Sequence, residues 1–177
     1  MPFTPYHFGP SGFIGLVLRK WIDVPVFVLA NVIIDIEVLL IMVLHLGRPY
    51  HRYCHTLLIG AAVGALWGMA AYPLRGLFKR AMHTLRLSYE PSFWKMALSG
   101  MLGACIHVLI DGAYHHDVRV FWPNTTISLW EILRDHITRE QGRIICVALF
   151  VAAVVYVLAL FASGGDTTEN KMSDCGK

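Results

Sequence analysis

Four long apolar segments constrain this chain more than any other feature. They cover about residues 24–46, 55–78, 93–113 and 142–162. Each reaches about 20 residues, the length that an α-helix needs to cross the hydrocarbon core of a bilayer. Of the 177 residues, 15% are charged and 56% are hydrophobic, whereas a soluble domain carries about 25% charged residues. The pattern predicts an all-α polytopic membrane helix bundle with four spanning helices.

A fifth apolar segment, at about residues 11–20, is too short to cross a membrane, which takes about 20 residues. We expect a short, half-inserted N-terminal helix, with Ser11 as a candidate N-cap. Residues 1–162 then form one membrane-embedded helical domain. The polar residues 163–177 are expected to form a disordered tail.

The polar connections and the glycines add detail to this bundle. Residues 75–92 are a basic connection after Pro73, which is expected to kink or end the second spanning helix. Within the polar residues 114–141, residues 128–139 are predicted to form an amphipathic helix. A glycine every fourth residue of the second segment predicts close packing against another helix. These glycines are Gly60, Gly64 and Gly68.

Composition argues against nucleic-acid binding and against cysteine-based metal sites or disulfides. The net charge is only +3 and no nucleic-acid-binding motif is visible, so we expect no nucleic-acid partner. The cysteines lack the short spacings of metal sites and disulfide frameworks, so neither is expected. They are Cys54, Cys105, Cys146 and Cys175.

Polar residues four apart stand out against these apolar surroundings. The three pairs are Asn31/Asp35, His51/His55 and His107/Asp111. On a helix, side chains at this spacing share one face. Asp35 falls near the middle of a spanning segment, where a carboxylate costs at least ~2.5–3.5 kcal/mol and is usually functional. We therefore expect the pairs to face the interior of the bundle.

Because successive helices alternate in direction, these polar residues come to one end of the bundle. His51 and His55 follow an ascending segment, and His107 and Asp111 close another ascending segment. If residues 11–20 descend and residues 24–46 climb back, His7 reaches the level of Asp35. The predicted layer contains His7, Asp35, His51, His55, His107 and Asp111.

Imidazole and carboxylate groups are the usual ligands of zinc and similar divalent ions. The layer therefore predicts a metal site with an open position for water; zinc is expected, with manganese or iron as alternatives. Six candidates also permit two metals. Among the neighbouring side chains, Asn31 is interpreted as a helix–helix hydrogen-bonding residue. Glu37 lies about 200° around the helix from Asp35 and is expected to face another partner.

Three other polar residues, His115, His116 and Asp117, are interpreted as solvated, or else as lining the entrance to the site. His45, His83 and His136 are expected to be interfacial or exposed.

The distribution of positive charge predicts the orientation of the bundle. The connections at the end away from the site carry Arg19, Lys20, Arg75, Lys79, Arg80, Arg86 and Lys95. Cytoplasmic loops are enriched in such residues. The interpretation is a multi-pass protein of the inner cell membrane, with the site on the extracytoplasmic side. Arginines at 119, 134, 139 and 143 act against this asymmetry.

Five short motifs, in order along residues 1–125, resemble a known family. They are Thr4-Pro5-Tyr6-His7, Asp35-Ile36-Glu37, His51-Arg52-Tyr53-Cys54-His55-Thr56, His107 with Asp111, and Trp122-Pro123. The family comprises small inner-membrane metal-dependent hydrolases of the LexA-binding type and related membrane domains of unknown function.

The resemblance implies a helical fold and metal chemistry similar to those of zinc-dependent phospholipase C. By that resemblance the six residues of the layer would be metal ligands or their neighbours. The chain departs from the family pattern in having Glu37 where an aspartate is frequent. It also reads Arg-Tyr-Cys-His-Thr where Arg-Gly-x-Thr-His-Ser is common.

The leading interpretation is a hydrolase acting on a membrane-borne ester, most plausibly the phosphate ester of a lipid. Activated water would attack the ester, and Asp35 or Asp111 would accept its proton. The partners expected are membrane lipids, including a lipid-like substrate. One alternative is a non-enzymatic membrane scaffold with a closed, structural metal site. Another is a haem protein with His55 and His107 as axial ligands, which would leave both aspartates unexplained.

Overall fold

A computed structural model describes residues 5–163 of the chain, and all of its regular structure is helical within that range. The elements are η1 (Pro5–His7), α1 (Phe8–Val17), α2 (Val24–Val43), α3 (Leu57–Ala70), η2 (Tyr72–Leu74), α4 (Arg75–Thr84), α5 (Phe93–Tyr114), α6 (Leu129–Leu133) and α7 (Arg139–Ala162). The predicted tail lies, apart from Ser163, outside the described residues, as do Thr4 and Cys175.

Three helices, α2, α5 and α7, are long and apolar enough to cross a membrane. The fourth predicted span is α3 followed by η2 and α4, which satisfies the same test only as a pair bent by 45°. The break lies between Ala70 and Tyr72, next to Pro73 in η2, where a kink or a helix end was expected. The all-α bundle with a short N-terminal helix is therefore confirmed, with three or four spans.

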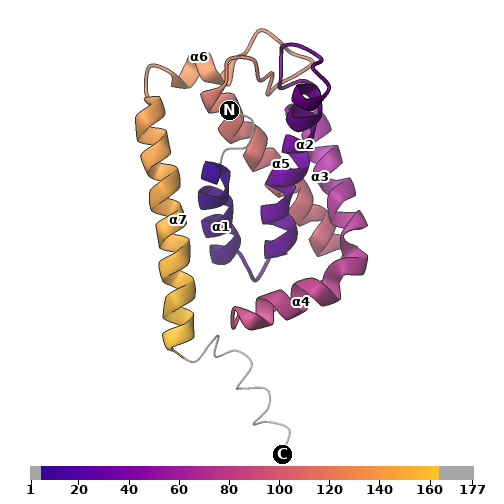
Figure 1. The fold of residues 1–177 in the computed structure, drawn as a ribbon, viewed down its shortest axis with the longest axis vertical. Coiled ribbons are helices and arrows are strands. Elements are labelled where there is room, and N and C mark those ends of the chain that lie inside the picture. The colour runs from indigo at the N-terminus through magenta and orange to yellow at the C-terminus, as the bar shows by residue number, and fades with distance from the viewer. Residues whose placement is uncertain (1–4, 164–177) are drawn as a thin grey trace, which may run out of the picture.

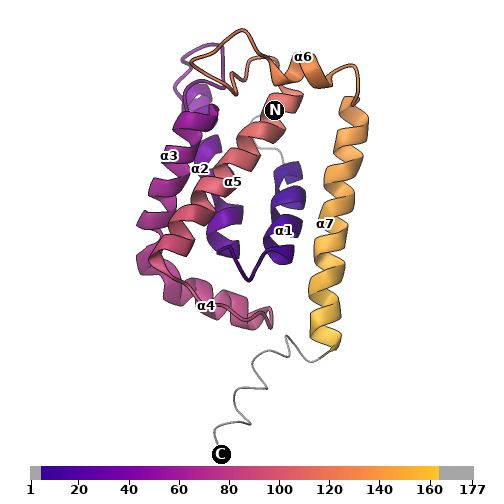
Figure 2. The same ribbon diagram turned by 180° about the vertical axis from the view of Figure 1, so that it is seen from behind.

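Figure 1 shows α1 and α2 as a hairpin whose turn lies at the lower end of the bundle. The long α7 stands beside α1 and packs against it through Ala153 and its neighbours. Seen from behind, α5 crosses in front of α2, and α6 bridges the upper ends of α5 and α7 (Figure 2).

The tightest interface joins α3 to α5. A Cβ atom on Gly64 would collide with the backbone oxygen of Gly100, and one on Gly68 with that of Met96. The two backbones can approach this closely only because these positions lack side chains. The close packing predicted from the glycine row is confirmed, and it holds α5 firmly against α3.

Two helix boundaries differ from the sequence predictions. The first helix begins at Phe8, so Ser11 is not its N-cap; its hydroxyl donates to the backbone oxygen of His7 at 2.6 Å. The predicted helix 128–139 ends at Leu133. A capping box of Thr138 and Gln141 starts α7 instead, because it satisfies the free N–H groups of a new helix start.

The predicted basic connection, residues 75–92, contains the helix α4 in its first part. Phe78 and Met82 of α4 are buried, while Arg75, Lys79 and Arg80 are exposed. Figure 1 shows α4 lying across the lower end of the bundle, opposite the loops that surround the candidate site.

Candidate metal centre

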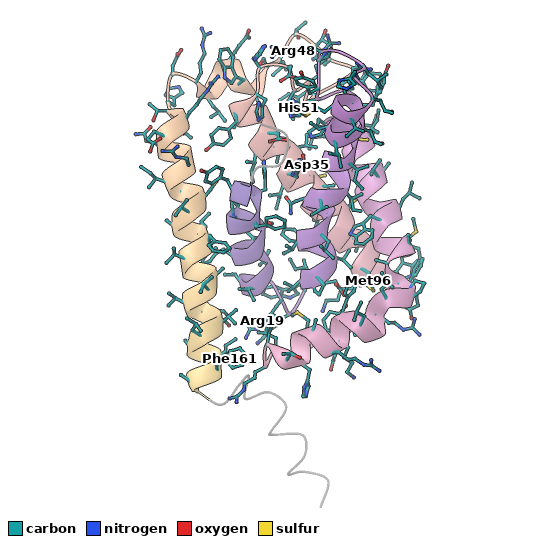
Figure 3. All side chains as sticks on the ribbon, viewed as in Figure 1. Arg19, Asp35, Arg48, His51, Met96 and Phe161 are labelled. Atoms are coloured by element: carbon teal, nitrogen blue, oxygen red, sulfur yellow. The ribbon has the colours of Figure 1, made fainter. Side chains whose placement is uncertain are left out.

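The histidines and aspartates predicted to form a layer meet at the upper end of the bundle. Asp35 comes from α2, His107 and Asp111 come from α5, and His7 ends η1. His51 and His55 come from the loop before α3. Figure 3 labels Asp35 and His51 near this end and Arg19 at the opposite one. The predicted convergence of the six side chains is therefore confirmed, and their role as ligands stays a prediction.

The expectation that His51 and His55 share a helix face is wrong. Both lie in an irregular loop, and α3 begins only at Leu57, capped by the Thr56 hydroxyl at 3.2 Å from the Ile59 nitrogen. The imidazole rings of His51 and His55 still lie 4.7 Å apart between centroids. The loop, rather than helical spacing, brings these two side chains together.

Glu37 holds this loop in place. Its carboxylate accepts the backbone N–H groups of Arg52 at 3.2 Å, Tyr53 at 2.8 Å and Cys54 at 3.1 Å. The same carboxylate lies 3.1 Å from Nδ1 of His55. The expectation that Glu37 faces another partner holds for the backbone of the loop, but both carboxylates also contact His55, Glu37 at Nδ1 and Asp35 at Nε2.

Asp111 is the centre of the cluster. Its Oδ2 atom lies 3.2 Å from Nε2 of His107, 3.4 Å from Nε2 of His55 and 4.0 Å from Nε2 of His51. Its Oδ1 atom lies 3.0 Å from Nε2 of His7 and 3.9 Å from Nε2 of His115. One buried carboxylate therefore faces five imidazole rings.

Four of these residues could hold one metal ion. Asp35, His55, His107 and Asp111 are all buried, and one ligand atom from each lies within 4.8 Å of the others. Asp35 completes the group because its Oδ1 is 3.4 Å from Nε2 of His107 and 3.7 Å from Nε2 of His55. Two imidazoles and two carboxylates are a suitable donor set for a divalent transition metal.

The opposite nitrogens of the histidines are held by side-chain oxygens. Nδ1 of His55 faces Glu37, and Nδ1 of His107 lies 3.3 Å from Oδ1 of Asn31. The Asn31 amide nitrogen donates to Val28 at 2.7 Å, so its oxygen is free to accept. In both histidines Nδ1 therefore carries the proton. This arrangement is typical of metal-binding histidines, because it directs the Nε2 lone pair at the ion.

The Nε2 atoms of His55 and His107 have no hydrogen-bond partner among residues 5–163, although both are buried. Their lone pairs face the oxygens of Asp35 and Asp111, a repulsive arrangement unless a positive charge lies between them. Burial disfavours a charged His55, but the carboxylates of Asp111, Asp35 and Glu37 outweigh burial and raise the pKa of His55 to about 10. The cluster thus demands a cation, either protons or a metal ion.

A second group lies beside the first. His51, His115 and Asp117 also offer ligand atoms within 4.8 Å of one another. Asp117 Oδ2 is 3.0 Å from Nδ1 of His51, and the His51 and His115 rings lie 4.6 Å apart. Asp111 contacts residues of both groups, so the arrangement has room for two ions.

The interpretation as solvated holds for His116, which is exposed, and only in part for His115 and Asp117, whose side chains are 30% and 22% exposed. Burial lowers the pKa of His115. The other reading of these residues, that they line an entrance, holds for His115 and His116.

Two cavities reach the cluster. One, of about 420 Å³, is lined by His7, Asp111, His115, His116 and residues of α7. The other, of about 290 Å³, reaches His51 from the loop side, between Arg52 and Trp122. The cluster is therefore accessible from outside the bundle.

The haem interpretation does not fit this geometry. The His55 and His107 rings lie 5.4 Å apart between centroids, and both aspartates contact the Nε2 atoms that would ligate the iron. A porphyrin between the two rings would have to displace these carboxylates.

No family model, curated protein or solved structure matches this chain.

Proposed function

We propose that the protein is a membrane-embedded metal-dependent hydrolase that acts on the phosphate ester of a lipid. The observation that carries the proposal is the pair of buried, unpartnered Nε2 atoms of His55 and His107, aimed at the carboxylates of Asp35 and Asp111. Leaving such atoms unpaired costs about 1–3 kcal/mol each, a cost that ligation of an ion would remove.

Zinc is the proposed ion, because neutral imidazole and carboxylate are its preferred nitrogen and oxygen ligands; manganese and iron accept the same set. When bound, such an ion polarises a phosphoryl oxygen and lowers the pKa of water to about 7. Asp35, His55, His107 and Asp111 would hold it. Glu37 and Asn31 would keep the imidazoles oriented through their Nδ1 atoms.

The cavity identifies the groups that could take a proton from the attacking water. Asp111 and His115 line the 420 Å³ cavity and Asp35 does not. Of the two aspartates expected to accept the proton, Asp111 is therefore better placed. His115 is an additional candidate, because burial lowers its pKa and keeps its imidazole neutral at pH 7.

The location of the site favours a substrate from the membrane. The cluster lies near one end of the helices that can span a bilayer, at the level where lipid headgroups would meet the bundle. We place the protein in the inner cell membrane with this end outside the cytoplasm. The exposed arginines and lysine of α4 lie at the other end, which agrees with the cytoplasmic preference of basic residues.

A membrane scaffold with a structural metal is the second candidate. A structural site has a closed ligand shell, whereas a catalytic site keeps a position open for water or substrate. The cavities that reach Asp111 and His51 favour the open site.

The first experiment measures metal in protein purified in detergent without a histidine tag. Near-stoichiometric zinc, manganese or iron in the wild type, lost in His55→Ala and in Asp111→Ala, is expected. Hydrolysis of phosphate-ester lipids, abolished by chelation and restored by the metal, is the second readout. A wild type that binds no metal after reloading rules out the proposal. Bound metal with no hydrolysis of any lipid phosphate favours the scaffold.

A further inference from the structure

We propose that an apolar groove between α5, α6 and α7 holds an acyl chain of a phospholipid, while Arg139 and Arg143 hold its phosphate beside the metal centre. The inference rests on the proposed function for the fate of the lipid, but lipid binding itself can be tested without hydrolysis. The groove would be the route by which the substrate reaches the site, and the two arginines would select the substrate.

The groove is a cavity of about 580 Å³, within the usual range of ligand pockets. Its walls are mostly apolar. They include Ile106 and Leu109 from α5, Leu133 from α6, and Ile145 and Leu149 from α7. Four of its lining residues also line the 420 Å³ cavity of the metal centre: Ile110, Tyr114, Arg139 and Cys146. The two cavities therefore adjoin. The 420 Å³ cavity carries the imidazole and charged side chains, and we call it the polar chamber.

The way α7 packs leaves this groove beside the bilayer. The lower half of α7 is held against α1 by Ala153, Tyr156 and their neighbours. Its upper half buries only Gly142 and Cys146. Since α5 and α7 are both long and apolar enough to span a membrane, the gap between their upper halves faces lipid, and the occupant proposed is a lipid chain.

Tyr114 marks the junction of the two cavities. A Cβ atom on residue 142 would collide with the Tyr114 hydroxyl, so Tyr114 can lie against α7 only because that residue is glycine. The side chain thus stands between the polar chamber and the groove, with its apolar ring available to both.

Charge identifies the part of the lipid that enters the polar chamber. Arg139 and Arg143 lie one turn apart at the start of α7, and both line the chamber that contains Asp111 and His115. Arg143 forms an exposed pair with Glu140 at 2.7 Å, and Arg139 forms no ion pair within residues 5–163. Guanidinium groups bind phosphate through paired N–H donors. A phosphate placed between these arginines and the metal centre would have its acyl chain in the adjoining groove.

The test uses photo-crosslinking, which needs no turnover. The probe is phosphatidic acid with a diazirine on one acyl chain, in nanodiscs of phosphatidylcholine that contain the full-length protein. A diacylglycerol with the same labelled chain serves as the neutral probe. Peptide mapping after irradiation reports which helices contact the chain.

We expect the phosphatidic acid probe to label the groove-lining residues of α5 and α7 in preference to the outer face of α3. Ala113→Phe fills the groove from α5 and should remove this labelling. Ala62→Phe, the same change at an exposed position of α3, should not. Leu149→Trp narrows the groove from α7, with Val155→Trp, at a position 58% exposed, as its control.

The arginine pair is tested with Arg139→Gln and Arg143→Gln, each against Arg80→Gln at the opposite end. Arg139→Gln and Arg143→Gln should each reduce labelling by phosphatidic acid about tenfold, which is the effect of one lost charge-assisted hydrogen bond. Labelling by diacylglycerol should stay unchanged. Bound metal, measured in every variant, verifies that the fold is intact.

Labelling spread evenly over the lipid-facing surfaces, or unaffected by both groove variants, would overturn the inference. If the arginine variants lose labelling by phosphatidic acid and by diacylglycerol equally, the assignment of the phosphate to the two arginines is overturned. Groove labelling in a protein that hydrolyses nothing would support the lipid site while refuting the hydrolase. Hydrolysis without groove labelling would support the hydrolase while refuting the lipid site.

Discussion

Two buried polar clusters lie at opposite ends of this bundle, and they are built differently. At the lower end, Asp23 is fully buried, accepts from the Tyr89 hydroxyl at 2.6 Å and caps α2 through Val26 at 3.2 Å. Its own N–H donates to the Ser99 hydroxyl oxygen at 2.6 Å. At the upper end, Asp35 and Asp111 face imidazole nitrogens that have no hydrogen-bond partner among residues 5–163.

The difference separates a polar cluster that is satisfied within the protein from one that could hold an ion. The Asp23 cluster uses its oxygens within the protein and ties α2 to α5 and to the segment before α5. The Asp111 cluster keeps lone pairs unmatched while its other nitrogens are held by Glu37 and Asn31. Buried polar groups in native proteins are normally paired, so the upper cluster needs a cation, either protons on the imidazoles or an ion that the four residues could hold.

The largest expected effect comes from Asp111→Asn. Because Asp111 contacts both imidazoles of the proposed centre, metal affinity should fall by more than the roughly 100-fold seen at most for supporting residues. Competition with a chelating dye measures the affinity. Asp23→Asn is the matched control, a buried aspartate exchanged at the other end, and should leave affinity unchanged. Full affinity in Asp111→Asn would show that the Asp111 carboxylate is not a ligand.

Glu37→Gln should have the next largest effect. The amide holds the loop and the His55 ring less well than the carboxylate, so metal affinity should fall by about 10–100-fold. The measurement is the same competition assay. If Glu37 serves only the fold, the variant would melt at a lower temperature with its affinity intact.

Tyr89→Phe, at the lower end, should lower stability without changing metal affinity. It removes the hydroxyl that Asp23 accepts, which should cost about 1–3 kcal/mol of unfolding free energy because a buried acceptor loses its partner. Metal affinity should not change. Denaturant unfolding in detergent measures the first quantity. A loss of metal in this variant would mean that the two ends are coupled.

The smallest expected effect is the pH dependence of the free energy of unfolding that the Tyr89 hydroxyl contributes. Burial and the neighbouring carboxylate of Asp23 raise the pKa of Tyr89 above its ordinary value of 10.0. The folded state thus holds the phenolic proton more tightly than the unfolded state. The contribution is complete below pH 10 and is lost as pH rises through the folded value. The stability difference between wild type and Tyr89→Phe should therefore shrink above pH 10 in melts at increasing pH. A constant difference would exclude this linkage.

Much of the upper cluster could be predicted from the sequence, because helix direction and rise determine the level of each residue. His7, Asp35, His107 and Asp111 were placed by counting residues along apolar segments, and they do converge. The pairing of Asn31 with another helix was predicted from its buried, mid-span position and is confirmed by its bond to His107.

The loops account for what could not be predicted. His51 and His55 were expected on a helix because they are four residues apart, but irregular backbone has no periodicity from which its path can be deduced. The role of Glu37 depends on that path, since its partners are three consecutive N–H groups of the loop. Asp117 joins the cluster for the same reason, whereas His115 directly follows α5 and contacts Asp111 at the helical spacing of four residues. Asp23 gave no signal beyond that of an ordinary helix cap, because its partner Tyr89 lies 66 residues away.

The packing of α7 against α1 has a consequence for how the protein is made. Every candidate ligand lies between His7 and Asp117, so translation delivers all of them before α7 begins at Arg139. The histidines and aspartates of a nascent chain therefore leave the ribosome ahead of α7, which forms one wall of the groove proposed above. The final helix then closes the molecule against the first one. Any ion that the cluster binds could in this way enter before the groove between α5 and α7 is complete.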